Sequence, residues 1–434
     1  MRIVLVSTYD MGRQPFGLAS PAAWLRRAGH EVACVDLSVS PFPAAEIQVA
    51  GLVAFHLPMH TATRLAGPLI RQVRELNPKA RICCYGLYAP MNAGYLRGLG
   101  VDSILGGEFE ADLVRLADGR GLGGPAIEKL TFIEPDRNGL PGLSRYAKLR
   151  VVDEARTVGY TEASRGCKHL CRHCPVVPVY QGAFRVVQPK VVLADIRQQV
   201  AAGARHITFG DPDFWNGPAH AMRIVEAMHG EFPELTFDAT IKVEHLRQHR
   251  DLLQPMRDAG CLFVTSAIES VDDDVLRKLD KGHTRADFLA VADDFQRAGL
   301  ALAPTFIAFL PWTSRESYAD LLRVIRDLDL IPNVSPVQLA LRLLIPAGSR
   351  MLELEEIAGL VTGFDSQALT HQWRYPDEEM NVLAAGVFAL VGGAQKAGRG
   401  RAEIFNLVWK ETMHEELDLV SRAAIPYLDE PWYC

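Results

Sequence analysis

Short apolar runs alternate with helix-like segments along residues 1–118. The runs lie at 2–7, 31–37, 51–57, 81–86 and 103–107. Between them, apolar positions recur with helical spacing, as at Leu69, Val73 and Leu76. Short apolar runs separated by helices are typical of strands that are buried on both faces of a parallel sheet. The pattern therefore predicts an N-terminal doubly wound α/β domain, with its ligand at the carboxyl ends of the strands.

A second alternating series covers residues 158–345. Its strand candidates lie at 157–164, 206–210, 236–242, 262–268, 302–310 and 337–345. A stretch rich in glycine and proline, 119–157, precedes the series and is expected to be a linker. The series predicts a partial (β/α)6 barrel of the TIM type, in which chemistry takes place on the loops after the strands. The remainder, 346–434, is expected to be mostly helical and to end in a tail that carries a cysteine.

The composition of the 434 residues excludes several classes of protein. With 48% hydrophobic and 23% charged residues, the chain can bury a core and is not globally disordered. Its 46 basic and 52 acidic residues give a formal net charge of -6, which excludes a generally basic nucleic-acid-binding protein. The longest run of apolar and small residues, 382–394, is shorter than the roughly 18–20 residues of a membrane span. We therefore expect a cytoplasmic protein without membrane or nucleic-acid partners, in which cysteines are reduced, metal-bound or catalytic.

Three cysteines stand close together at the start of the second series. Cys167, Cys171 and Cys174 have the spacing C-x3-C-x2-C, in RGCKHLCRHCP, directly after the first strand candidate. Thiolates so close on one loop can converge on one metal centre, and iron–sulfur clusters normally take four cysteine ligands. Three ligands would leave one iron open to a small molecule. Two alternatives stay open: a zinc site completed by His169 or His173, and a redox pair of Cys171 and Cys174.

The cysteine spacing and its place after the first strand resemble the radical S-adenosylmethionine (radical SAM) superfamily. The resemblance implies that a 4Fe–4S cluster on the three cysteines binds S-adenosylmethionine (SAM) at its open iron. Reduction of the cluster, by a partner such as flavodoxin or ferredoxin, would cleave SAM to a 5′-deoxyadenosyl radical that starts chemistry on a substrate. One departure is His173, which stands where the family often has an aromatic carbocycle.

Later strand ends resemble the SAM-binding motifs of the family. The resemblance implies that a carboxylate in HITFGDPDF binds the methionine ammonium of SAM. It also implies ribose contacts in SAIES and adenine packing by TFIAFLPW (305–312). Two basic residues would each hold a carboxylate. The residues concerned are Asp211, Asp213, Glu269, Ser270, Lys242 and Arg342. Each motif also has an ordinary structural interpretation: helix caps for the aspartates and Ser270, a solvated Lys242, and a plain core strand for 305–312.

Residues 1–118 resemble the cobalamin-binding domain that precedes many radical SAM domains. The resemblance rests on the loops FHLPMHTAT, GLYAP and GGEFE after the third, fourth and fifth strands, and implies cobalamin contacts from Gly86, Gly106, Gly107 and Glu108. Glycines there let the backbone approach a bulky ligand. The DxHxxG motif that ligates cobalt from below is absent, so cobalamin is expected to lack that lower histidine ligand. An empty domain used for packing is the alternative.

The tail IPYLDEPWYC resembles that of radical SAM proteins named for a CUAEP or CCAEP tail. The resemblance implies that selenocysteine or cysteine would follow Cys434, in a reading frame cut at a UGA codon. Cys434 would then belong to a vicinal thiol or selenol pair with a redox or metal-handling role. A terminal residue with a free thiol is the alternative. The other cysteines are expected to lie in the core, at Cys34, Cys83, Cys84 and Cys261.

The function that the resemblance implies is radical SAM chemistry on an unknown small molecule or peptide, in the form of cobalamin-dependent methylation. One alternative keeps the radical chemistry without cobalamin, as a rearrangement or a thiol- or selenol-forming reaction. Another alternative is a non-catalytic zinc or iron–sulfur protein. Corrinoid absorbance distinguishes the first two, and counts of iron and sulfide decide on the third.

Overall fold

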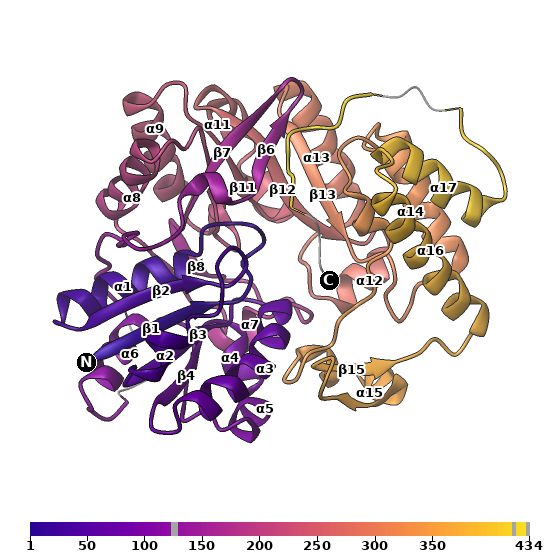
Figure 1. The fold of residues 1–434 in the computed structure, drawn as a ribbon. Coiled ribbons are helices and arrows are strands. Elements are labelled where there is room, and N and C mark those ends of the chain that lie inside the picture. The colour runs from indigo at the N-terminus through magenta and orange to yellow at the C-terminus, as the bar shows by residue number, and fades with distance from the viewer. Residues whose placement is uncertain (123–128, 419–421, 431–434) are drawn as a thin grey trace.

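The computed structural model describes residues 1–122, 129–418 and 422–430, and its N-terminal part is a doubly wound domain (Figure 1). The parallel sheet of this domain has the order β2-β1-β3-β4-β5. Its strands are β1 (Arg2–Ser7), β2 (Glu31–Asp36), β3 (Leu52–His56), β4 (Arg81–Tyr85) and β5 (Ser103–Leu105). Each of the five predicted apolar runs therefore forms a strand, because helices cover both faces of the sheet.

The helices of this domain divide the side chains of the sheet between two cores. One face carries α1 (Phe16–Arg27) and α6 (Glu110–Ala117). The other face carries α2 (Ala44–Gln48), α3 (His60–Leu76), α4 (Tyr88–Met91) and α5 (Ala93–Gly98). Neighbouring residues of a strand point to opposite faces, so Cys83 packs in the first core and Cys84 in the second. All four cysteines that were predicted to lie in the core are buried: Cys34, Cys83, Cys84 and Cys261.

The second sheet is curled and mostly parallel, with the order β13-β12-β11-β10-β7-β6-β16. Its parallel strands are β7 (Glu154–Thr161), β10 (His206–Phe209), β11 (Thr236–Thr240), β12 (Cys261–Glu269) and β13 (Ala301–Phe306). The crossover helices are α8 (Pro189–Ala201), α9 (Pro218–Glu231), α10 (Val243–Gln248), α11 (Leu253–Asp258), α12 (Asp273–Lys278), α13 (Arg285–Ala298) and α14 (Arg315–Asp327). This series confirms the predicted β/α architecture of the second part of the chain.

Two antiparallel strands that the sequence analysis missed extend this sheet. β6 (Lys148–Val151) lies within the expected linker and forms a hairpin with β7. β16 (Tyr427–Leu428) then pairs with β6, so the yellow C-terminal segment in Figure 1 returns to the edge of the sheet. The carboxylate of Asp429 fixes this return, because its Oδ1 accepts a hydrogen bond of 2.6 Å from the backbone nitrogen of Lys148.

The predicted sixth strand at 337–345 is the main difference from the expected fold. The chain forms a short 3-10 helix there, Pro336–Leu339, followed by a single parallel bridge between Phe309 and Arg342. Proline begins this helix because its fixed φ suits the first helical position. A side chain takes the place of the missing strand at the edge of β13. Oε1 of Gln338 accepts a 2.9 Å hydrogen bond from the backbone nitrogen of Phe306.

The C-terminal region is mostly helical and also contains a hairpin. Its elements are α15 (Glu355–Leu360), β14 (Val361–Asp365), β15 (Thr370–Trp373), α16 (Glu378–Lys396) and α17 (Arg401–Met413). The apolar run 382–394 lies in α16, which buries Val387 but leaves Val382 and Phe388 more than half exposed. In the parts of the chain that the structure describes, no helix is long and apolar enough to cross a membrane.

A buried charge network joins the two α/β domains. The Arg165 guanidinium forms ion pairs with Glu108 at 3.1 Å, Glu110 at 2.7 Å and Glu162 at 2.6 Å. Tyr180 donates a further hydrogen bond of 3.1 Å to Glu108. These carboxylates come from both domains, so the network fixes the N-terminal domain against the loop that carries the cysteines.

Candidate functional site

A small hairpin holds the cysteine loop at the carboxyl end of β7. β8 (Ser164–Gly166) pairs with β9 (Phe184–Val186), and the three cysteines and the short helix α7 (Val177–Tyr180) lie between them. Gly166 has a φ of +75°, and a Cβ there would come within 2.4 Å of the Tyr180 ring and 2.5 Å of a backbone oxygen. Glycine is therefore required immediately before Cys167, because no other residue fits this turn.

The three cysteine thiols lie close enough to influence one another. Burial raises the pKa of the Cys174 thiol to about 12, and the charges of Cys171 and Cys167 raise it further. Burial also raises the pKa of Cys167, with a smaller contribution from Cys171. A coordinated metal removes the proton from its thiol ligands, even where burial raises the thiol pKa as it does at Cys167 and Cys174. The loop thus carries three neighbouring thiols, a donor type that suits an iron–sulfur centre.

Both histidines of the cysteine loop turn away from the thiols toward other partners. Nε2 of His173 is 3.0 Å from Oε1 of Glu269. Nε2 of His169 is 3.3 Å from Nε2 of His245. Neither imidazole is placed as the fourth ligand of a Cys3His zinc site. The donor set of three cysteines alone fits an iron–sulfur cluster with one open iron.

Asp211 anchors the start of the cysteine loop. Its Oδ2 accepts a 2.9 Å hydrogen bond from the backbone nitrogen of Ala163, and its Oδ1 accepts one of 2.5 Å from the hydroxyl of Ser164. Burial raises the pKa of this carboxyl to about 7. Asp211 therefore has a structural task in addition to the SAM contact that was predicted for it.

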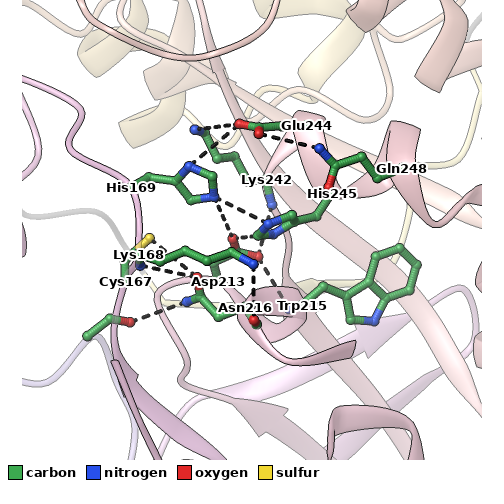
Figure 2. Close-up of polar contacts among 11 residues, drawn as sticks. Cys167, Lys168, His169, Asp213, Trp215, Asn216, Lys242, Glu244, His245 and Gln248 are labelled. Atoms are coloured by element: carbon green, nitrogen blue, oxygen red, sulfur yellow. Dashed lines mark hydrogen bonds and ion pairs between the residues drawn. The ribbon is translucent and has the colours of Figure 1, made fainter. Parts of the chain in front are cut away.

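Asp213 lies beside Lys242 and a pair of histidines (Figure 2). Its Oδ1 accepts hydrogen bonds of 3.3 Å from the backbone nitrogens of Trp215 and Lys242, so it also caps a 3-10 turn. The Lys242 ammonium is 3.2 Å from Oε2 of Glu244. The structure thus brings the two residues predicted for the methionine part of SAM together, at the carboxyl ends of β10 and β11. The contribution of His245 was missed, because no local pattern links it to Asp213.

Glu269 and Ser270 line a cavity of about 260 Å³ together with Ile307, Ala308 and Leu310. The predicted ribose motif and the predicted adenine segment therefore meet at one hollow. Burial tends to raise the pKa of Glu269, but the Lys281 and His173 charges outweigh it and lower the pKa to about 2. Glu269 is consequently a charged acceptor. Lys281 and His173 are partners that the sequence analysis did not identify.

Arg342 packs against the β14–β15 hairpin, and its contact with a SAM carboxylate stays a prediction. Its guanidinium stacks 3.9 Å from the centre of the Trp373 ring and donates a hydrogen bond to the backbone oxygen of Trp373. The predicted strand is absent at this position, so the side chain turns to the β14–β15 hairpin instead. Within the described residues, no ion pair of Arg342 with a carboxylate is formed.

A larger cavity of about 870 Å³ opens inside the second sheet. Its floor is polar, with Thr208, Asp238, Thr240 and Thr265 on consecutive strands. Oδ1 of Asp238 accepts hydrogen bonds from Thr208 at 2.6 Å and His206 at 2.9 Å. Barrel interiors are usually filled with bulky branched apolar residues, so a hydroxyl-lined hollow indicates a ligand site. The sequence analysis did not predict this cavity. The alternation of polar Thr236, Asp238 and Thr240 within one strand is the sequence feature that indicates a polar interior.

A third cavity, of about 180 Å³, lies between the two α/β domains. It is lined by residues of the three predicted cobalamin loops, among them His56, Gly86 and Gly107. Burial lowers the pKa of His56 to about 3, and its Nδ1 is buried without a hydrogen-bond partner. Gly106 and Glu108, which were also predicted to contact cobalamin, do not line this cavity, and Glu108 pairs with Arg165. Cys434, the predicted redox residue of the tail, lies outside the described residues.

The class of the second domain follows from its sequence family. Residues 161–325 match the family model described as the Radical SAM superfamily. The matched stretch begins at the end of β7 and includes the three cysteines and all of β10 to β13. The chain therefore contains a radical SAM domain, which implies a 4Fe–4S cluster and SAM as cofactors.

Curated relatives of the chain include methylating and methylthiolating enzymes. The threonylcarbamoyladenosine tRNA methylthiotransferase MtaB of Thermotoga maritima is 22% identical over 232 residues, which cover 52% of this chain and 51% of the relative. The hopanoid C-3 methylase of Methylococcus capsulatus is 23% identical over 343 residues, which cover 74% of this chain and 66% of the relative. The chain thus spans about half to two thirds of the length of these relatives.

Solved structures with the same fold cover both α/β domains. The cobalamin-dependent SAM radical enzyme OxsB, with aqua-cobalamin bound, has a TM-score of 0.68 and 14% identity, and the match covers 88% of this chain and 66% of OxsB. The methyltransferase TsrM from Kitasatospora setae, with cobalamin and a [4Fe-4S] cluster bound, has a TM-score of 0.65 and 15% identity, with 90% and 89% covered. At this identity the likeness shows the fold, including the N-terminal domain.

Proposed function

We propose that this protein is a cobalamin-dependent radical SAM enzyme that methylates a small polar substrate. The observation that carries the proposal is the trio Cys167, Cys171 and Cys174 on the loop after β7, which has no fourth protein ligand beside it among the described residues. The doubly wound domain packed against this loop supports the cobalamin part. When bound, the cluster and SAM would supply hydrogen abstraction from an unactivated position, and cobalamin would supply a methyl group.

The residues of the chain divide the remaining work among three cavities. The thiolates hold the cluster, and the cavity at Glu269 and Ser270 takes the adenosine part of SAM. The charged Glu269 is suited to accept hydrogen bonds from hydroxyl groups. The cavity above Asp238 takes the substrate and shields it from water, since the C-terminal segment from Tyr427 to Glu430 lines one of its sides.

The interdomain cavity suits a corrin by its lining but is small in volume. It combines a neutral histidine, two glycines and a face of aromatic residues, Phe16, Phe109 and Tyr160. Its volume of about 180 Å³ is below the roughly 300–1,000 Å³ of ordinary small-molecule sites. This cavity can therefore enclose only part of a corrin, and the rest would lie outside it. The lower face of the corrin would not meet a DxHxxG histidine, since the loop after β1 contains none.

The substrate we propose is a small molecule with hydrogen-bonding groups rather than a nucleic acid. The cavity above Asp238 has the volume of a site for a drug-sized molecule. Thr208, Thr240 and Thr265 offer hydroxyl groups along its floor. The net charge of -6 does not favour a polyanion such as tRNA. A reductant such as flavodoxin or ferredoxin would supply the electron for SAM cleavage.

Anaerobic reconstitution with iron, sulfide and hydroxocobalamin tests the proposal directly. We expect about four irons and four sulfides per chain, corrinoid absorbance that stays with the protein through desalting, and 5′-deoxyadenosine from SAM. Cys167→Ala should lose cluster and SAM cleavage together, and Cys261→Ala, at a buried cysteine far along the sheet, should keep both. Zinc without sulfide would overturn the radical SAM part. A cluster without retained corrinoid would overturn the cobalamin part and favour the cobalamin-free alternative.

The finer resemblance to proteins with a CUAEP or CCAEP tail is also a proposal. Its support is the sequence of residues 430–434 and the course of the described segment before it, which runs from β16 along the large cavity. Glu430 lines that cavity and accepts a hydrogen bond of 3.2 Å from Tyr9. An in-frame Ala-Glu-Pro codon sequence after the codon that follows Cys434 would support it. Its absence from the genomic DNA would reject it.

A further inference from the structure

Helix α16 turns an apolar face to solvent at the periphery of the molecule (Figure 1). Val382 and Phe388 are 65% and 58% exposed, and Ala385 and Ala389 are exposed beside them. Residues 380–395 contain no charged side chain. A continuous apolar surface on a globular protein often marks an interaction site. We call this exposed side of the helix the α16 face.

Six residues follow one another along the α16 face with alternating spacings of four and three. They are Glu378, Val382, Ala385, Ala389, Gly392 and Lys396. This spacing places residues on one stripe of a helix, and it is the repeat by which two helices pack along their length. Small residues in such a stripe let the two backbones approach closely. A Cβ at Gly392 would meet no atom within 4 Å in the described chain outside its own helix, so the stripe is open to a second helix.

The charges at the two ends of the α16 face are opposite. Glu378 and Glu379 lie in the first turn of the helix, and Lys396 lies in the last. In the part of the chain that the structure describes, Lys396 forms no ion pair, and Glu378 forms one only with the exposed Arg374. A helix that fits this face is therefore basic where it meets Glu378 and acidic where it meets Lys396.

A second copy of α16 in the antiparallel orientation meets this requirement. With the two-fold axis at the level of residue 387, the stripe positions pair as Glu378 with Lys396, Val382 with Gly392, and Ala385 with Ala389. The largest exposed side chain of the stripe thus lies against a glycine. A parallel pair would bring like charges together at both ends, whereas the antiparallel pair also aligns the two helix dipoles favourably.

Phe388 lies at the edge of the stripe, one residue from the level of this two-fold axis. Because a helix rises 1.5 Å per residue, the two copies of Phe388 would be only about 3 Å apart along the helix direction, on the same side of the pair. Their rings can then cover each other, and an aromatic pair contributes more than the burial of its area. On the opposite side, Gly386 leaves space for Glu411 of α17, whose Oε1 would be 3.9 Å from a Cβ at this glycine.

We propose that the protein forms a two-fold symmetric homodimer, in which α16 packs antiparallel against α16 of a second copy. Two-fold interfaces are self-complementary, and the α16 face is complementary to itself in shape and in charge. A helix of 19 residues is about 28 Å long, and one pair of such helices forms a contact at the small end of specific interfaces. We therefore expect a reversible dimer with a dissociation constant in the micromolar range.

Sedimentation equilibrium of the anaerobic, cluster-loaded protein over a series of concentrations measures this dissociation constant. Phe388→Glu should raise the constant about tenfold or more, because it places two carboxylates side by side at the two-fold axis. The matched control is Val152→Glu in the β6–β7 turn, where Val152 is 75% exposed, and it should leave the constant unchanged. All of these positions are exposed, so each variant should retain the iron and sulfide content of the wild type.

A charge exchange tests the antiparallel register. Lys396→Glu should weaken the dimer, and the addition of Glu378→Lys to the same chain should restore most of the affinity. The two positions are about 27 Å apart along one helix, so this rescue can act only between copies.

A wild type that stays monomeric at every concentration would overturn the proposal. So would a dimer that Phe388→Glu weakens no more than Val152→Glu does, or a charge exchange that restores no affinity. Retention of the wild-type monomer on phosphatidylcholine vesicles, lost in Phe388→Glu, would also overturn it and assign the α16 face to a lipid surface.

Discussion

Arg165 of the radical SAM domain and Glu108 of the N-terminal domain form a buried ion pair, with Nη1 and Oε2 3.1 Å apart and side chains 7% and 0% exposed. Glu110 and Glu162 share the same guanidinium. One cation thus compensates three carboxylates at the boundary between the domains. Burial raises the pKa of Glu108, and the Arg165 charge opposes this rise. The charges at the domain boundary are therefore balanced by the Arg165 guanidinium.

Replacement of Arg165 should therefore destabilise the protein strongly. Arg165→Met leaves the buried Glu108 and Glu110 and the partly buried Glu162 without a cation, and we expect a loss of about 3–5 kcal/mol in the free energy of unfolding in urea. The matched control is Arg197→Met, whose ion pair with Glu231 lies on the surface and should have no measurable effect. Equal unfolding midpoints for the two variants would contradict the role of Arg165.

The cysteine loop provides a second prediction, which compares a cysteine with its neighbouring histidine. Cys174→Ala should reduce the iron and sulfide content after reconstitution to near zero. The loop has only three thiols for the cluster, and the variant would leave two. Cleavage of SAM to 5′-deoxyadenosine should disappear in proportion. His173→Phe should keep the cluster, since His173 contacts Glu269 and not the thiols. Cluster loss in His173→Phe as complete as in Cys174→Ala would show that this histidine is a ligand.

The buried His56 predicts how stability depends on pH. Burial lowers the pKa of its imidazole from the usual 6.5 to about 3, so the folded protein keeps it neutral while the unfolded chain takes up a proton below pH 6.5. The stabilisation is complete above pH 6.5 and is lost as the pH falls toward 3. Between pH 7 and pH 5 the loss should be about 2 kcal/mol.

His56→Phe removes this dependence while keeping a ring against Tyr85 and Phe109, which lie 5.3 and 6.0 Å away. Urea unfolding at pH 7 and at pH 5 measures the effect. The variant should lose less stability than the wild type over this interval, by the same 2 kcal/mol or so. Parallel losses in the two proteins would mean that the folded protein protonates His56 as readily as the unfolded chain does.

Gln338 provides a prediction for the open edge of the second sheet. Its side chain is buried, and Gln338→Leu leaves the backbone nitrogen of Phe306 without an acceptor. Such an unpaired buried group costs about 1–3 kcal/mol in the free energy of unfolding. Gln367→Leu, on an exposed turn, is the control and should be near neutral. Amide hydrogen exchange at Phe306 should accelerate only in Gln338→Leu.

The sequence predicts the regular part of this fold because its strands are short apolar runs between helices. Where a strand is exposed or half-polar, as in β6 with Lys148 and Arg150, the same rule fails and the stretch looks like a linker. The segment 337–345 shows the opposite error, since its apolar run predicts a strand that does not form. Its apolar residues are buried by packing, but Pro336 turns the chain into a 3-10 helix and Gln338 satisfies the sheet edge that a strand would have used.

The candidate site divides in the same way between local and tertiary information. The three cysteines are a local motif, so their spacing alone predicts them as candidate cluster ligands. His245 and Lys281 have no such signal, because they reach His169 and Glu269 only through the curl of the sheet. The expected orientation of Arg342 depended on a strand at 337–345, where the structure has a 3-10 helix and a single bridge instead. Pairings between distant segments therefore required the structure.

The single bridge between Phe309 and Arg342, in place of a sixth strand, affects how this enzyme architecture can diversify. Residues 332–338 contribute to the wall of the large cavity without taking part in the strand ladders. Loops tolerate insertions and exchanges far better than strands do. Evolution can thus reshape this wall, and with it the choice of substrate, while the five strands that position the cysteine loop stay as they are.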